Sequence, residues 1–249
     1  MQTLLALIAG SVIGSVLGLV GAGGAMLSVP ILIYLFDFPP KAATVAALAI
    51  VFTAALAGVY PKWKKGNVLI KDAVIIWALG LVTNIGGAIF AKHLPDKFIT
   101  LGFAVILIAA GTSMLKQGIP DQMERNRPIF LLIFISLIIG ATTGIFGVGG
   151  GFLAIPVLVI YFKISQEKAS GTSLLIIALN CLTAFISHYP KWGEISWSVP
   201  ITIAVGAVIV TNLASAKSHK VPTKILRRAF AILLYLIAVY TTLKTLNLF

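Results

Sequence analysis

The sequence predicts an all-α integral membrane protein made of two related halves, and three observations lead to this prediction. The chain has 249 residues, of which 59% are hydrophobic and 10% charged, whereas a soluble domain carries roughly a quarter charged residues. Long apolar runs recur along it, and in lipid such runs must satisfy their own backbone hydrogen bonds, which helices do. A ten-residue glycine–proline motif occurs twice, at 21–30 and at 147–156.

The apolar runs fall into two sets of five. Most are long enough for a helix to cross a bilayer, which takes roughly 17–25 residues. The second run of each set has twelve residues and reaches only about 18 Å as a helix, so it predicts a short or re-entrant arm. We therefore expect a first repeat at 1–115, a linker at 116–128 and a second repeat at 129–249. The runs are 3–19, 25–36, 42–60, 68–91 and 98–115, then 129–146, 151–162, 169–187, 196–216 and 225–246.

Further landmarks recur in the same order in both halves. The tetrapeptide Tyr-Pro-Lys-Trp occurs at 60–63 and again at 189–192, and Thr-Asn occurs at 83–84 and at 211–212. Tyr34 also pairs with Tyr161, Lys41-Ala42 with Lys168-Ala169, and Pro95-x-Lys97 with Pro222-x-Lys224, and all the offsets lie between 126 and 129 residues. This shared order indicates duplication of one membrane unit.

The basic residues predict how the halves are oriented. If the first two segments of each half form a hairpin, each half crosses an odd number of times and the second half is inverted. This arrangement places 14 of the 19 Lys and Arg on one side and 5 on the other, whereas a single broken helix gives 10 against 9. Because cytoplasmic loops are rich in Lys and Arg, inverted repeats are favoured, with both termini outside the cytoplasm. The net charge of +12 thus reflects orientation and not nucleic-acid binding.

The two glycine motifs predict where a ligand binds. Inverted hairpin tips should approach each other near the midplane, and each is followed by a short helix whose N-terminus carries unpaired N–H groups and a partial positive charge. Two such ends at one cavity form an anion site without a buried Lys or Arg; close helix packing at small residues is the alternative. The residues predicted to form the site are Gly21, Gly23, Gly24 and Ala25, with Gly147, Gly149, Gly150 and Gly151.

Two asparagines within the apolar segments extend the candidate site. Asn84 and Asn212 each follow a threonine and are related by the repeat. An asparagine in lipid needs a partner. Each one either links helices as a structural hydrogen bond or offers its amide to the substrate.

The third segment of the second half adds hydroxyl groups and a thiol. Thr172 and Ser173 stand where the first half has Val45 and Ala46, so this polarity is one-sided. The hydroxyls either donate to an oxyanion or bond their own helix backbone. Cys181 is the one cysteine, which excludes an intrachain disulfide; it is either a packing residue or a thiol that meets the substrate.

The groups that enzymes need are missing from the predicted spans. No Asp, Glu, Lys or Arg lies deep in a span, and the sequence has no metal-ligand cluster, HExxH motif or Walker motif. An intramembrane Ser–His hydrolase would have to use Ser173 or Ser187 with His188, which falls at a helix end. We therefore predict that the chain is not an enzyme and has no cofactor or metal site.

These residues and motifs resemble the sulfite exporter TauE/SafE family. The resemblance lies in the doubled Gly-x-Gly-Gly-[AG]-x-x-x-x-Pro motif, the run Lys168–Leu174, the Pro-x-Lys elements and the chain's size, and it covers nearly the whole chain. It implies a permease for small sulfur-containing anions such as sulfite, sulfonates or thiosulfate, in a bacterial or archaeal plasma membrane. The first half departs from the pattern, with Thr44-Val-Ala-Ala against Gly-Thr-Ser-Leu in the second, so an unequal site is expected.

The sequence thus predicts a multi-pass secondary transporter for a small sulfur oxyanion, which alternating access exposes to each side in turn. Its expected partners are the anionic substrate, the lipid bilayer, a coupling ion (proton or sodium) and a second copy of the chain in a homodimer. The alternatives are a transporter or channel for another small organic anion, an intramembrane enzyme, and a membrane assembly factor.

Overall fold

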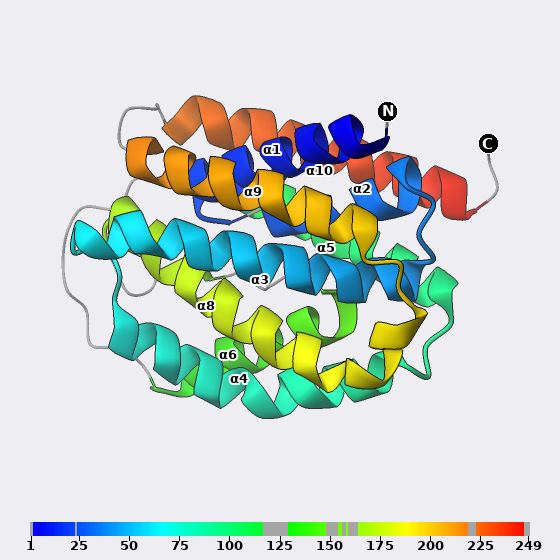
Figure 1. Ribbon diagram of the computed structural model, residues 1–249. Coiled ribbons are helices and arrows are strands. Elements are labelled where there is room, and N and C mark those ends of the chain that lie inside the picture. Colours follow the sequence, from blue (N-terminus) through cyan, green and yellow to red (C-terminus); the bar gives the residue numbers. More distant parts are fainter. Residues whose placement is uncertain are drawn as a thin grey trace.

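The computed structural model describes residues 2–22, 24–116, 129–147, 154–155, 158, 164–218 and 223–246, and it is helical throughout these ranges apart from short connections. The helices lie roughly along one common direction (Figure 1). The first-half helices are α1 (Gln2–Val20), α2 (Gly24–Leu35), α3 (Pro40–Lys64), α4 (Ile70–Ala91) and α5 (Asp96–Lys116); the second-half helices are α6 (Ile129–Phe146), α8 (Gln166–Ser187), η1 (Tyr189–Glu194), α9 (Ser198–Lys217) and α10 (Thr223–Thr245).

The predicted all-α class is confirmed, since the described part of the chain contains helices and no strands. The twelve-residue run at 25–36 forms a short helix, Gly24–Leu35. Its counterpart at 151–162 lies almost wholly outside the described residues. The 3-10 helix η1 was not predicted from the sequence.

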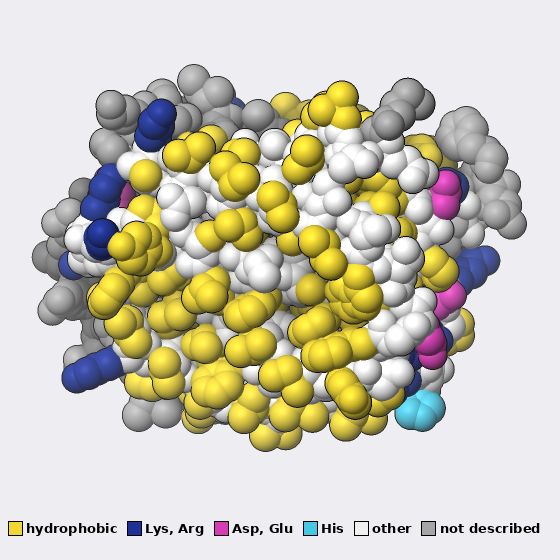
Figure 2. Space-filling model, viewed as in Figure 1, with side chains coloured by type: hydrophobic (Ala, Val, Ile, Leu, Met, Phe, Trp, Pro, Cys, Tyr) yellow, Lys and Arg dark blue, Asp and Glu magenta, His cyan; other side chains and the backbone are white. Residues whose placement is uncertain are grey.

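Five described helices are long and apolar enough to cross a bilayer: Gln2–Val20, Pro40–Lys64, Ile70–Ala91, Glu167–Ser187 and Ser198–Lys217. On the face shown in Figure 2, hydrophobic side chains cover the middle of the molecule, and charged side chains gather at its two ends. This distribution fits a bilayer around the middle band. Helix α3 runs from Lys41 near one end to Lys62 near the other (Figure 1).

The helices pack in a pattern that the two halves share. Helix α1 packs along α9, and α6 packs along α4. Helix α3 packs against α8 at the centre, and α5 packs against α10. Exchanging α1 with α6, α3 with α8, α4 with α9 and α5 with α10 reproduces the same set of contacts. Each half therefore places its first helix on the third long helix of the other half, and the halves are intertwined.

Small residues allow this close packing. A Cβ on Gly14 of α1 would lie 2.5 Å from the carbonyl oxygen of Ala207 in α9, and one on Gly144 of α6 would collide with the carbonyl oxygen of Asn84 in α4. Stripes of small residues spaced four apart bring membrane helices into such contact. The stripe on α1 is Gly10, Gly14 and Gly18, and its repeat-related stripe on α6 is Ser136, Gly140 and Gly144.

Candidate functional site

The first glycine motif begins where α1 ends. The N–H of Gly21 donates a hydrogen bond to the carbonyl oxygen of Leu17 at 2.8 Å, and Gly21 has a φ of +78°. This left-handed conformation after a helix end favours glycine. A Cβ at Gly21 would collide with the hydroxyl of Ser170, so the first tip lies directly against the start of α8.

The second motif begins in the same way at the end of α6. The N–H of Gly147 donates to the carbonyl oxygen of Thr143 at 2.9 Å, and its φ is +70°. A Cβ at Gly147 would lie 2.8 Å from Cγ2 of Thr44 and 2.9 Å from its carbonyl oxygen. Each first glycine therefore ends a helix against the start of the other half's third helix.

The sequence had led us to expect that the two tips meet near the midplane. In the structure Gly21 and Gly147 lie far apart. Gly147 lies at Thr44, near the start of α3, while Gly21 lies at Ser170, which bonds Lys62 near the end of α3. The 18 residues from Thr44 to Lys62 span about 27 Å of helix. The reason is the length of α1, whose 19 residues carry the chain about 28 Å before it turns.

The N-terminus of α2 lies against α1. A Cβ on Gly24 would lie 2.5 Å from the carbonyl oxygen of Ile13 and 2.6 Å from Cβ of Leu17, so close helix packing explains this glycine. Gly23, Gly149, Gly150 and Gly151 lie outside the described residues, and so does the side chain of Ala25.

A buried lysine closes the end of the molecule beside Gly21. Lys62 is 4% exposed, and its Nζ donates to the hydroxyl oxygens of Ser170 at 2.9 Å and Ser218 at 3.3 Å. The Ser170 hydroxyl in turn donates to the carbonyl oxygen of Val20 at 3.1 Å. This network, which we call the Lys62 seal, joins the ends of α1, α3 and α9 to the start of α8.

Sequence reasoning missed Lys62, because the apolar run ends at Tyr60 and the following lysines read as a surface loop. Helix α3 instead continues through Pro61 to Lys64, which turns Lys62 inward. The repeated Tyr-Pro-Lys-Trp tetrapeptide was the available signal, since it duplicates this lysine.

The repeat-related lysine, Lys191, lies at the opposite end of the molecule and lines an open pocket. We call this the Lys191 pocket; its lining residues are Lys41, Thr44, Ala91, Lys92, Ile99, Ile145, His188 and Lys191. Thr44 is the residue that Gly147 contacts, so the pocket lies beside Gly147.

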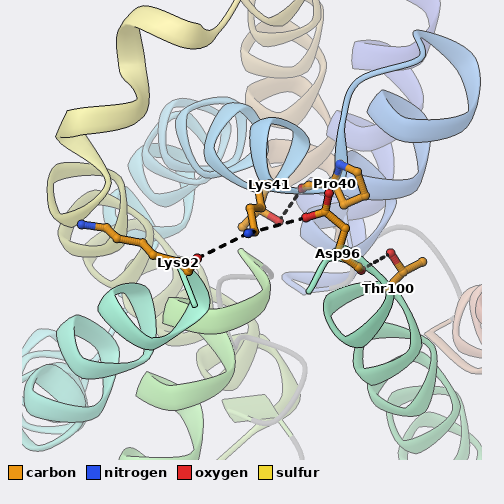
Figure 3. Close-up of polar contacts among 6 residues, drawn as sticks. Pro40, Lys41, Lys92, Asp96 and Thr100 are labelled. Carbon is orange, nitrogen blue, oxygen red and sulfur yellow. Dashed lines mark hydrogen bonds and ion pairs between the residues drawn. The ribbon is translucent and has the colours of Figure 1, made fainter. Parts of the chain in front are cut away.

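Three of the pocket's lining residues are lysines, and one has an acidic partner. The Lys41 Nζ donates to the backbone carbonyl oxygen of Lys92 at 3.3 Å and lies 3.9 Å from a carboxylate oxygen of Asp96. Figure 3 shows both contacts, with the side chain of Lys92 extending away from them. The pocket therefore has an excess of positive charge.

His188 lies in the same pocket, just after α8 ends. It is 4% exposed, and its Nδ1 lies 2.8 Å from the carbonyl oxygen of Ala184. Burial lowers the pKa of His188 below its ordinary value; the Ala184 carbonyl acts in the opposite direction, and the charges of Lys92 and Lys191 lower it further. On balance these effects favour a neutral imidazole.

The two asparagines have different surroundings. Asn84 is fully buried, and its Nδ2 donates to the backbone oxygen and to Oδ1 of Asn180 at 3.0 and 2.9 Å. Its own Oδ1 and the Nδ2 of Asn180 are buried without a hydrogen-bond partner. Asn212 is partly buried and donates to the carbonyl oxygen of Ala57 at 3.2 Å, as a link between helices would.

The glycine contacts pair Asn84 with Thr211. A Cβ on Gly144 would collide with the carbonyl oxygen of Asn84, while one on its repeat counterpart Gly18 would lie 2.6 Å from the carbonyl oxygen of Thr211. The structural counterpart of Asn84 is therefore Thr211, one residue before Asn212.

The remaining candidates lie inside α8. The Thr172 hydroxyl accepts a hydrogen bond from the N–H of Leu69 at 3.0 Å, which anchors the start of α4. Ser173 and Cys181 are both fully buried. Among the described residues no group of three or more His, Cys, Asp or Glu could hold a metal ion.

A second, largely apolar pocket adjoins the Lys191 pocket through Ile99, which lines both. It also includes Pro30 of the first motif and Phe146, which precedes the second tip. Tyr34 and Thr241 line it, and their hydroxyl oxygens are buried without a hydrogen-bond partner. The two adjoining pockets thus offer both charged and hydroxyl groups near Gly147.

Intertwined apolar helices, a buried lysine at one end and a basic pocket at the other define a multi-pass membrane protein of the transporter class. The chain belongs to the sulfite exporter TauE/SafE family, whose family model matches residues 6–241. This membership makes it a membrane transporter and not an enzyme.

Relatives in bacteria and archaea match over most of their length. A protein of Xylella fastidiosa named "Probable membrane transporter protein" is 25% identical over 240 residues, covering 93% of this chain and 91% of the relative. Proteins with that description from Bacillus subtilis (23% identical; 95% and 96% covered) and Methanocaldococcus jannaschii (26% identical; 90% and 89% covered) are also similar.

Proposed function

We propose that the chain is a secondary transporter for a small sulfur-containing oxyanion such as sulfite, a sulfonate or thiosulfate. The observation that carries this proposal is the pair of repeat-related lysines. Lys62 and Lys191 stand at opposite ends of the central helices, each beside a tip glycine of one motif, and one is sealed while the other lines a pocket.

A buried lysine supports anion passage on electrostatic grounds. Removing an ammonium group from water is costly unless a partner offsets the loss of hydration. The hydrogen-bond partners of Lys62 are the hydroxyls of Ser170 and Ser218, which carry no charge; the carboxylate of Glu167 attracts the ammonium group without being a recorded hydrogen-bond partner. An oxyanion that replaced the two hydroxyls would offset both the charge and the lost hydration.

The proposed path runs from the Lys191 pocket along α8 to the Lys62 seal. Asn180 lies ten residues from Ser170 and eight from His188, which is about halfway at 1.5 Å per residue. The unpaired Nδ2 of Asn180 is an available donor for an oxyanion there. Gly21 and Gly147, with their small size, let each tip close against α8 or α3 when the other end opens.

Inverted repeats give this path its two states. The 14-to-5 division of Lys and Arg supports inversion, and so does the placement of repeat-related residues at opposite ends of the molecule, Gly21 against Gly147 and Lys62 against Lys191. The start of α1 and the end of α10 both lie toward one end (Figure 1). We place the Lys62 end in the cytoplasm of a bacterial or archaeal cell and both termini outside it. The homodimer and the identity of the coupling ion stay predictions at this point.

Transport by the purified full chain in proteoliposomes tests the function. Radiolabelled thiosulfate and sulfite should enter faster than in protein-free liposomes, and unlabelled sulfonates should compete. Lys62→Met should lower the rate at least about tenfold, which corresponds to about 1.4 kcal/mol in the barrier. The variant should still fold, since the Ser170 and Ser218 hydroxyls keep their own hydrogen bonds to the carbonyl oxygens of Val20 and Ser215 and the methionine side chain has a similar volume.

Lys64→Met is the matched control, because Lys64 is exposed two residues further on; its rate should equal that of the wild type. Sulfur-anion uptake no faster than in protein-free liposomes would refute the proposed substrate class. Uptake of acetate or another carboxylate in its place would support the alternative of a different organic anion.

A further inference from the structure

The Lys191 pocket combines fixed positive charge with a group that can change its charge near neutral pH. The charged groups that face His188 are Lys41 from α3, Lys92 after α4 and Lys191 from η1. Asp96 of α5 reaches the pocket through Lys41. Asp96 is the acidic group recorded beside a pocket lysine in the described part of the chain, so three lysines and one carboxylate leave the pocket with a net positive charge.

The hydrogen bond of His188 determines which ring nitrogen can take up a second proton. Nδ1 lies 2.8 Å from the carbonyl oxygen of Ala184, and a carbonyl oxygen can only accept. The neutral ring therefore carries its proton on Nδ1 and a lone pair on Nε2. A second proton must go to Nε2.

An anion in the pocket would change the charge balance around this ring. Burial, Lys92 and Lys191 all disfavour the imidazolium and lower the pKa of His188. An oxyanion between the lysines would offset their repulsion and attract the imidazolium directly. The pKa of His188 would therefore rise when the anion binds, and by linkage a proton would tighten anion binding.

We propose that the Lys191 pocket takes up one small oxyanion together with one proton, and that Nε2 of His188 holds the proton. The proton comes from the solvent with the anion and leaves with it, so no bond other than Nε2–H forms or breaks. This inference rests on the proposed function, and it identifies the coupling ion as a proton.

The proposal predicts a definite pH dependence. Anion affinity should rise as the pH falls through the pKa of the anion-bound histidine and should level off below the pKa of the empty pocket. A pKa rise of one unit on binding gives about a tenfold gain in affinity. Thiosulfate is the suitable probe because it stays fully ionised across this range, whereas sulfite itself takes up a proton there.

Isothermal titration calorimetry on the full chain in detergent measures the proton directly. Thiosulfate is titrated at about pH 6 in two buffers with different ionisation enthalpies, and the difference in binding heat gives the protons taken up. Wild-type protein should take up a substantial fraction of one proton per anion. His188→Gln should take up none, and its affinity should not change with pH.

His93→Gln is the matched control, since His93 is exposed on the surface near Lys92; it should behave like the wild type. Thiosulfate binding to wild-type protein without proton uptake overturns the proposal, and this measurement needs no variant to fold. Unchanged uptake in folded His188→Gln also overturns the assignment to His188. A complete absence of thiosulfate, sulfite and sulfonate binding instead counts against the proposed function itself.

Discussion

The same tetrapeptide, Tyr-Pro-Lys-Trp, lies at both ends of the molecule but has a different structure at each end. At one end Tyr60–Trp63 forms part of the last turns of α3, and Lys62 is buried in the Lys62 seal. At the other, Tyr189–Trp192 forms most of the 3-10 helix η1, and Lys191 lines a pocket. A duplicated sequence thus need not give a duplicated environment, because the helix that precedes each tetrapeptide ends at a different point.

Under the alternating access proposed above, two related halves should differ in this way in any one state of the transporter. If the difference between the two ends belongs to one conformation of the transport cycle, the Lys62 seal should open and the Lys191 pocket should close during transport. If it is permanent, each end keeps its own structure throughout. The following predictions distinguish these cases or measure how unequal the ends are.

The largest effect is expected from adding a methyl group to the tip glycines. Gly21→Ala places Cβ on the Ser170 hydroxyl and 2.7 Å from its carbonyl oxygen, in a left-handed conformation. The conformation costs about 1–2 kcal/mol and the overlap about 1–3 kcal/mol more. We expect a loss of about 3 kcal/mol or more, measured as a large fall in the thermal unfolding temperature in detergent.

Two further glycines calibrate this result. Gly147→Ala meets Thr44 at 2.8 Å and should be destabilised somewhat less than Gly21→Ala. Gly66→Ala has a φ of +70° with nothing within 4 Å of the new Cβ, so it should lose only about 1 kcal/mol. Equal losses at Gly66 and Gly21 would show that packing at the first tip contributes nothing.

Cysteine labelling should give the next largest difference. In a Cys181→Ser background, Lys191→Cys should react with a membrane-impermeant maleimide about a hundredfold faster than Lys62→Cys, since reaction follows exposure of the thiolate. Lys64→Cys, at an exposed position beside the seal, should react fast and report access from that side. If saturating thiosulfate speeds labelling at Lys62→Cys, the closed Lys62 end belongs to one conformation of the transport cycle. If thiosulfate leaves the labelling rate unchanged, the difference between the two ends is permanent.

The sequence predicted the helices well because their signals are local. The apolar runs reproduce α1 to α6 and α8 to α10 to within a few residues, and the short run after the first glycine motif correctly predicted α2. The partners of each helix are not local. Nothing in the run 3–19 indicates that α1 packs on α9 of the other half and carries Gly21 to the far end.

The candidate site was predicted in part for the same reason. The repeated glycines marked both turns, and Gly21 and Gly147 have a positive φ there, but their separation depends on helix length and pairing. Lys62 was missed because a proline after an apolar run usually ends a helix, whereas Pro61 stays inside α3. The partner of Asn84 could not be found from the repeat, because Asn180 has no asparagine counterpart in the first half.

A smaller effect should separate the two asparagines. Asn84→Ala leaves the backbone oxygen and side chain of Asn180 without their donor in a fully buried site, which should cost about 2 kcal/mol. Asn212→Ala removes one partly buried hydrogen bond to Ala57 and should cost about 0.5–1 kcal/mol. Thermal unfolding measures both. Similar losses of stability would mean that the Asn84–Asn180 hydrogen bonds contribute no more to folding than the Asn212 bond. The transport rate of folded Asn84→Ala then tests whether the amide pair lies on the proposed path.

The smallest effect is expected at the open end. Lys191 is partly exposed, so its attraction for an anion is screened by water and salt. Lys191→Gln should raise the KM for thiosulfate about fivefold, or about 1 kcal/mol, with kcat nearly unchanged, and added salt should shrink the difference. Lys97→Gln, at an exposed position outside the pocket lining, is the control and should leave KM unaltered. A fall in kcat equal to that of Lys62→Met would instead mean that both lysines act on passage, and that the two ends are functionally alike despite their different structures.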